Sequence, residues 1–377
     1  MGGEPLGQAA IRVAMKLHSS RPLPLIYFTA MAKKEIRHTT LYRAYRPQSF
    51  KEVRGQEHVV RVLKAAVENK KIAHAYLFSG GRGTGKTSVA RILAREVGVS
   101  AKDLYEMDAA SNRGIGEIRE LREGAYSMPF ESPYKFYIID EAHMLTKEAW
   151  NAFLKTLEEP PSHCIFVLAT TERDKIPETI QSRCEIYSFN QPSREDLAHM
   201  VSDVAKKEGY SLEKSAAELV ALLSEGSFRD ALGILQKVLT VSKDKKVDVA
   251  EVEEVSGAPR GELVRQLLAA IARKDAEVAL AAIRKASEEN IDARVLTKLL
   301  IFRCRALLLS RHAPLLAGSF MEGLPETDVV LAKELSKNPG VNSETLRALL
   351  EAYRDAAYAA VPYLPLELAI IEISGTK

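Results

Sequence analysis

Residues 75–90, AYLFSGGRGTGKTSVA, decide the fold. The run 75–79 is short and apolar and ends at glycines, which predicts a buried strand. Residues 80–87, GGRGTGKT, fit the pattern G-x-x-x-x-G-K-[ST], and a helical stretch follows from about Thr87. In that setting, backbone N–H groups and a helix N-terminus point toward phosphate oxygens. The stretch therefore predicts a phosphate-binding loop (P-loop) in an α/β domain.

This loop predicts a nucleotide and its magnesium ion. Lys86 is expected to reach the β- and γ-phosphates, and the Thr87 hydroxyl is expected to hold Mg²⁺. The loop residues expected to bind ATP are Gly80, Gly81, Arg82, Gly83, Thr84, Gly85, Lys86, Thr87 and Ser88.

Two further apolar runs, 135–139 and 164–169, extend the sheet. Continuous apolar strands separated by helices predict a parallel sheet that is covered on both faces. Ligands bind at the C-terminal edge of such sheets, where Asp140 is expected to bind Mg²⁺ and Glu141 to polarise a water molecule. His143 has no ligand partners spaced around it, which favours a structural role over metal binding.

Three other polar residues could take part in the phosphate chemistry. Thr171 at the end of the third run could sense the γ-phosphate, or it could be an ordinary polar strand end. Arg183 could act as a finger in a neighbour's site. Arg229 lies in the first turn of a predicted helix, where a cation is unfavourable unless a polyphosphate binds there; otherwise it is a solvated arginine.

The remaining chain reads as helices. Capping patterns begin helices at Ser193 and Ser227, and 241–246 reads as a polar linker. We therefore expect an N-terminal extension at 1–38 that is disordered, and an α/β nucleotide-binding domain at 39–190. A small helical domain at 191–243 and an all-α domain at 247–377 are expected to follow.

Composition limits the class of protein. The chain has 377 residues, of which 46% are apolar and 27% charged, and this excludes wholesale disorder. Its three cysteines exclude a disulfide framework and fit a reducing, cytoplasmic location. The net charge of +3 is too small to indicate nucleic-acid binding by bulk charge. No apolar run is long enough for a membrane span.

The basic N-terminal stretch 1–37 leaves three interpretations open. It is a disordered extension, or sequence upstream of a true start at Met31; it is an organellar transit segment; or it is a secretory signal. ATP chemistry disfavours the last.

The assembled motifs resemble those of the AAA+ clamp-loader ATPases. The matching segments are 42–47, 53–58, 80–87, 108–112, 140–145, 151–161, 182–184, 226–231 and 364–369. The resemblance implies a RecA-like AAA+ domain, a helical lid domain and a helical collar that forms oligomers. It implies an ATP-driven motor subunit of the bacterial replicative polymerase holoenzyme, which loads the sliding clamp on primed DNA. A DNA-directed DNA polymerase label would belong to that complex.

The resemblance also implies residue roles. Thr171 resembles sensor 1, Arg229 resembles sensor 2, and Arg183 resembles the finger that acts in trans. The adenine is expected near Tyr42, Arg46, Val53 and Gln56. The segment Ser111, Asn112 and Arg113 is expected to contact DNA phosphates without reading bases.

Partners follow from the resemblance as well: other clamp-loader subunits in a five-member assembly, the sliding clamp, and primed DNA of any sequence. Residues 95–105 lack the cysteines of the family's zinc module, so no zinc is expected. The chain ends at Lys377, so segments that bind the polymerase core and the helicase are expected to be absent.

The alternatives are an ATP-binding scaffold with little hydrolysis, a replication-factor-C-type small subunit and a branch-migration helicase. Intact Lys86, Glu141 and Arg183 count against the scaffold, and residues 151–161 together with the C-terminal helices favour the bacterial loader over the other two. A helicase motor should form a closed hexamer.

Overall fold

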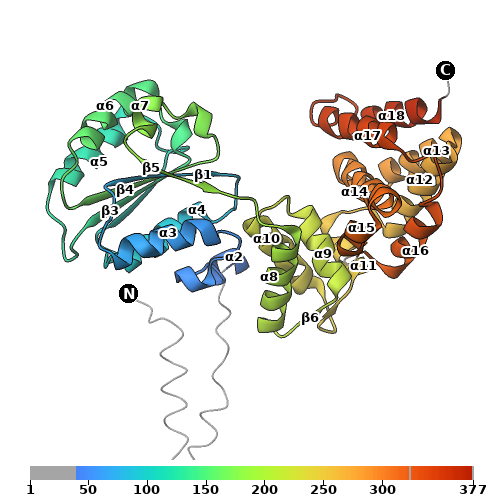
Figure 1. Ribbon diagram of the computed structural model, residues 1–377, viewed down its shortest axis with the longest axis horizontal. Coiled ribbons are helices and arrows are strands. Elements are labelled where there is room, and N and C mark those ends of the chain that lie inside the picture. Colours follow the sequence, from blue (N-terminus) through green and yellow to red (C-terminus); the bar gives the residue numbers. More distant parts are fainter. Residues whose placement is uncertain (1–39, 322–323, 376–377) are drawn as a thin grey trace, which may run out of the picture. The chain divides into compact units, whose positions relative to one another are not determined.

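The computed structural model describes residues 40–321 and 324–375, so the expectations for 1–38 lie outside the described residues (Figure 1). The first part of this region is a five-stranded sheet in the order β2-β3-β4-β1-β5. All of its neighbouring strands run parallel. The strands are β1 (Ala75–Gly80), β2 (Leu104–Asp108), β3 (Lys135–Asp140), β4 (Cys164–Thr170) and β5 (Glu185–Phe189). The predicted α/β parallel-sheet fold is confirmed.

Helices cover both faces of the sheet (Figure 1). Alternate strand residues point to opposite faces, so Phe78 and Ile138 pack with α3 (Glu57–Glu68) and α4 (Lys86–Glu96). Leu77 and Phe166 pack on the other face with α5 (Ile115–Tyr126), α6 (Lys147–Glu158) and the short α7 (Glu178–Gln181). Each fully buried Leu or Phe contributes roughly 1.5–3 kcal/mol to stability relative to an exposed one. This packing holds the strands in place, and with them the polar residues at their C-terminal ends.

Strand register sets that edge. Asp108 lies opposite Asp140 on β3, and Ser79 of β1 lies opposite Thr170 of β4. The C-terminal ends of the strands therefore meet where the P-loop begins.

The second part of the structure is a helical module with its own core. It contains α8 (Arg194–Lys207), α9 (Lys214–Leu223), α10 (Phe228–Val241) and α11 (Val249–Ser256). Ser193 caps α8 in a capping box and the Ser227 side chain caps α10, as the sequence predicts. Such caps stabilise a helix by about 1 kcal/mol each.

This module differs from the expected one at both ends. Residues 241–246 are no linker between domains, because β7 (Lys246–Val247) pairs with β6 (Ser211–Leu212) and Val252 of α11 is buried in the same core. The short α2 (Leu41–Ala44) also packs here: Leu41 is buried in this core, and its N–H donates to Gln236 Oε1 at 2.9 Å. Apolar Val247 and Val252, rather than the polar stretch before them, determine where the module ends.

The third part packs helices around one further core. Its elements are α12 (Gly261–Arg273), α13 (Ala276–Glu288), α14 (Ala293–His312), α15 (Pro314–Met321), α16 (Glu326–Leu335), α17 (Ser343–Asp355) and α18 (Leu364–Ser374). Inside it, Asp328 is buried against the guanidinium of Arg303 at 2.6 Å. Within the described residues, no helix combines the length and the apolar character needed to cross a membrane.

Candidate nucleotide site

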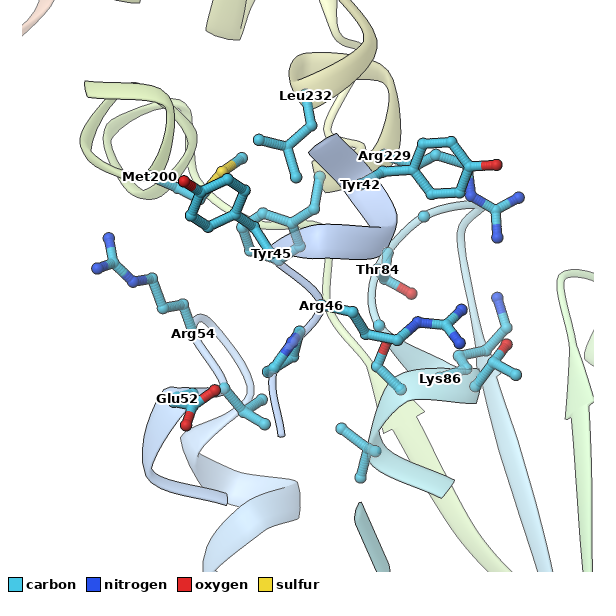
Figure 2. A pocket seen from close by; sticks show the side chains of 18 of the residues that line it. Tyr42, Tyr45, Arg46, Glu52, Arg54, Thr84, Lys86, Met200, Arg229 and Leu232 are labelled. Atoms are coloured by element: carbon cyan, nitrogen blue, oxygen red, sulfur yellow. The ribbon is translucent and has the colours of Figure 1, made fainter. Parts of the chain in front are cut away.

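A cavity of about 650 Å³ joins the P-loop, the end of β3, the segment from Tyr42 to Arg54 and the helices α8 and α10 (Figure 2). Its volume lies within the usual range for small-ligand sites. Most of the residues predicted to bind nucleotide line it: Tyr42, Arg46, Val53, Arg82, Gly83, Thr84, Gly85, Lys86, Thr87, Ser88, Asp140, Glu141 and Arg229.

The P-loop touches the start of α10. Gly83 has φ +70°, and its carbonyl accepts the backbone N–H of Phe228 at 3.1 Å. A Cβ at Gly83 would lie 2.0 Å from Ser227 Oγ, so only glycine fits without displacing the cap of α10. The glycines therefore shape the loop and also let the helical module approach it closely.

Lys86 is held inside the loop. Its Nζ donates to the carbonyls of Gly80 and Gly81, both at 2.8 Å, and the residue is only 5% exposed. Burial lowers the pKa of this ammonium, while the nearby carboxylates of Glu141 and Asp140 act in the opposite direction. An ammonium that is buried inside the P-loop can donate charge-assisted hydrogen bonds to phosphate oxygens bound there.

Two oxygen ligands for a cation lie together at the end of β3. The Thr87 hydroxyl, in the first turn of α4, donates to Asp140 Oδ2 at 2.7 Å. Hydroxyl and carboxylate oxygens are the ligands that Mg²⁺ prefers. Within the described residues, no group of three or more His, Cys, Asp and Glu side chains could hold a metal on its own. A magnesium ion commonly takes one or two protein oxygens and completes its shell with waters and substrate phosphates, so two oxygens here fit such an ion.

Glu141 follows directly on the cavity wall. Its carboxylate Oε2 accepts a hydrogen bond from Thr171 Oγ1 at 3.1 Å. Thr171 does not line the cavity itself but reaches it through this contact. Sequence reasoning predicted both residues, but it did not predict that they bond to each other.

Cationic side chains gather at one end of the cavity. Figure 2 shows the guanidinium groups of Arg46 and Arg229 on the same side as Lys86. Burial, and then the charge of Arg91, lowers the pKa of Arg46. Arg229 lies over the Tyr42 ring, with 5.7 Å from its guanidinium carbon to the ring centroid. Mutually repelling cations in one half-buried place favour a polyanionic ligand.

The other end of the cavity holds a group of apolar side chains, with Glu52 and Arg54 beside them. Tyr45, Met200 and Leu232 lie together there (Figure 2). Sequence reasoning gave none of the three a role at the site; Met200 and Leu232 lie on helical stripes, and such apolar residues read as core. Burial and the hydrogen bond to Glu208 Oε1 raise the pKa of the Tyr45 phenol to about 12, so it stays neutral near neutral pH.

Two of the residues expected beside the adenine do not lie at the end with Met200 and Leu232. Arg46 extends to the cationic end (Figure 2). Gln56 does not line the cavity; it is buried, and its amide donates to Asn190 O at 2.7 Å while its Oε1 accepts the Asn190 N–H at 3.1 Å. Gln56 therefore ties the strand-end connection at Asn190 to the segment before α3.

Arg183 lies outside the cavity. Its guanidinium donates to Glu158 Oε1 and to the Thr179 carbonyl, each at 2.7 Å. The side chain remains 34% exposed. The structure does not bring it to the Lys86 site of the same chain.

The predicted DNA-contacting segment also lies apart from the cavity. Ser111 Oγ donates to Asp108 Oδ2 at 3.1 Å, and Asn112 Nδ2 donates to the Asp108 carbonyl at 3.0 Å. Arg113 is exposed just before α5. Asp108 therefore shapes the turn that leads into this helix.

Comparison with known proteins accords with this geometry. A family model described as "DNA polymerase III, delta subunit" matches residues 55–112 and 99–193. The gamma subunit of DNA polymerase III from Buchnera aphidicola is 36% identical over 273 residues, which are 67% of this chain and 75% of that protein. The chain belongs to the DNA polymerase III gamma/tau family. AAA+ proteins of this family bind nucleotide.

A second gamma/tau relative covers more of the chain. The tau subunit from Bacillus subtilis is 36% identical over 363 residues, or 89% of this chain. The chain spans 63% of the length of that relative. Among solved structures, the Holliday junction branch migration motor RuvB of Thermotoga maritima is 26% identical, covering 60% of this chain and 79% of that one. Its TM-score of 0.48 is too low to bear on function.

Proposed function

We propose that this chain binds ATP in the cavity and hydrolyses it as the motor subunit of a bacterial clamp loader. One observation carries the proposal: the P-loop, the Thr87–Asp140 pair and Glu141 meet at the cationic end of a cavity whose other end holds the apolar side chains of Tyr45, Met200 and Leu232. A triphosphate and a purine base need those two environments in that order.

The cationic end would bind the triphosphate. Lys86 would exchange its carbonyl contacts for the β- and γ-phosphates, with Arg46 and Arg229 beside them. The base would lie at the apolar end against Tyr45, Met200 and Leu232. This assignment moves Arg46 from the adenine to the phosphates.

Thr87 and Asp140 would hold the magnesium ion. When bound, that ion supplies positive charge to phosphate oxygens that become more negative during the reaction. The absence of a structural zinc site stays a prediction.

Glu141 and Thr171 would act on the attacking water. The carboxylate would accept hydrogen bonds from that water and polarise it, and the Thr171 hydroxyl, already bonded to Glu141, would orient it or sense the γ-phosphate. Arg183 of one subunit would enter the site of its neighbour, which would make turnover depend on assembly.

The helical module of α8 to α11 would couple nucleotide binding to the conformation of the chain. Arg229 lies in the first turn of α10, next to Phe228, whose N–H bonds Gly83. A phosphate bound by both Arg229 and the P-loop would tie α10 to the sheet domain.

Arg113 and its neighbours would contact the phosphates of primed DNA. The assembly would be cytoplasmic and would also hold the sliding clamp.

The test is ATP turnover by the chain assembled with its loader partners, with clamp and primed DNA added. We expect stimulated hydrolysis that Lys86→Ala abolishes. ATP binding without any turnover would instead support the scaffold alternative, and a closed hexamer in sizing experiments would support a helicase.

A further inference from the structure

His143 is a buried imidazole with polar partners at both ring nitrogens. It lies in η3 (Ala142–Met144), directly after Glu141, and only 7% of its side chain is exposed. Its Nδ1 is 3.1 Å from Thr170 Oγ1 and 3.5 Å from Glu141 Oε2, while its Nε2 is 3.2 Å from Glu172 Oε1. Contacts at both nitrogens fix the ring's orientation.

The outer partner of this ring is itself held in place. Glu172 receives Lys175 Nζ at 2.8 Å, and its own N–H donates to Thr170 Oγ1 at 3.0 Å. The hydrogen bond from Lys175, together with its charge, lowers the pKa of the Glu172 carboxyl, so the group stays an acceptor for the imidazole. An imidazole whose Nε2–H donates to Glu172 can accept the Thr170 hydroxyl at Nδ1, so these two partners hold the ring in place beside Glu141 Oε2.

Next to Thr170 on the Nδ1 side lies Glu141, whose Oε2 is 3.5 Å from the ring nitrogen and which has an unusual backbone conformation. Glu141 has φ +47° and ψ 42°, a left-handed conformation that disfavours residues with a side chain. Its N–H donates to Asp140 Oδ1 at 3.0 Å, and its Oε2 receives Thr171. Such a conformation persists only where the surroundings hold it, and His143 packs on the same carboxylate oxygen.

We propose that His143 is a positioning residue that keeps the Glu141 carboxylate against Thr171, facing the site of the attacking water. The inference rests on the proposed ATPase function and refines it. His143 does not line the cavity and reaches it only through Glu141, so it acts on the rate of hydrolysis through Glu141 and leaves nucleotide binding alone.

The test compares three substitutions in the chain assembled with its loader partners, clamp and primed DNA. His143→Ala is expected to lower kcat for ATP at least tenfold while KM changes less than twofold. His143→Asn places an amide near the Nδ1 position and is expected to regain most of the rate. His143→Gln reaches the Nε2 position, keeps only the Glu172 contact, and is expected to regain little.

A double-mutant cycle tests whether the loss of kcat in His143→Ala depends on Glu141. We expect His143→Ala to cause no further loss in a Glu141→Gln background, as single-turnover rates would show. An unchanged kcat in His143→Ala, equal rescue by Asn and Gln, or the same loss in both backgrounds overturns the proposal. If His143→Ala does not fold, which thermal melting shows, the Asn and Gln pair carries the test.

The two levels of inference fail differently. No ATP turnover by the unsubstituted assembly overturns the proposed function, and this proposal with it. Normal turnover by the unsubstituted chain together with a His143→Ala variant that is unaffected overturns the role of His143 alone.

Discussion

The Thr87 hydroxyl donates a 2.7 Å hydrogen bond to Asp140 Oδ2, which joins the first turn of α4 to the C-terminal end of β3. We predict that Asp140→Asn weakens ATP binding in the presence of Mg²⁺ by about tenfold or more, because the amide is a poorer cation ligand. ATP binding in EDTA should be unaffected. Calorimetric titrations in the two buffers measure this, and an equal loss in both would contradict the metal role.

The buried strands could be predicted from sequence because their residues are apolar throughout. Residues 75–79, 135–139 and 164–169 all lie in central strands. The edge strands β2 and β5 were missed, because each has one partner only and exposes Tyr105 and Ile186 to solvent. Edge strands tolerate mixed apolar and polar sequences, which show no clear alternation of apolar residues.

The site was predictable where a spaced motif defines it and not where packing defines it. Lys86, Thr87 and Asp140 meet as expected because strand order fixes them. Met200 and Leu232 reach the cavity only through the docking of helices α8 and α10, and nothing in their spacing separates a lining residue from a core residue.

Gly83 should be intolerant of a side chain because of Ser227. Gly83→Ala is predicted to destabilise the chain by about 1–3 kcal/mol, from a clash at 2.0 Å with Ser227 Oγ and from the left-handed backbone. Urea unfolding measures the loss. In a Ser227→Gly background the loss should be smaller, and an equal loss there would contradict the contact. Gly116→Ala on α5, where a Cβ meets nothing within 4 Å, is the control.

Arg183 should matter to a neighbouring subunit rather than to its own. Arg183→Ala is predicted to leave ATP affinity of the isolated chain within twofold and to lower turnover of the assembly by 10³-fold or more, on the order known for arginine fingers. Mixing Arg183→Ala chains with Lys86→Ala chains tests this. Activity that survives when every interface lacks one of the two groups would rule out action in trans. Arg61→Ala on the exposed side of α3 is the control.

Asp103 should make the α5–β3 connection sensitive to acid. Burial favours a raised pKa, but the N–H groups of Glu131, Phe130 and Ser132 outweigh it and lower the pKa from 3.8 to about 2. The carboxylate's contribution is therefore complete above pH 3.8 and is lost as the pH falls through 2.

The measurement for Asp103 is a comparison with Asp103→Asn. At pH 7 the free energy of unfolding of the variant should be about 1–3 kcal/mol lower, because an amide satisfies these donors less well. The variant should therefore unfold at a lower urea concentration. The gap between the two proteins should narrow from pH 4 toward pH 2. A gap that stays constant or widens in acid would contradict the assigned cause.

The central claim is that the P-loop of this chain binds the phosphates of ATP through Lys86. Isothermal titration of the purified chain with ATP and Mg²⁺ tests it most directly, with Lys86→Ala in parallel. We predict saturable binding at one site per chain, weakened at least tenfold in the variant. No heat of binding with the unsubstituted chain, or the same affinity in both proteins, would contradict the account.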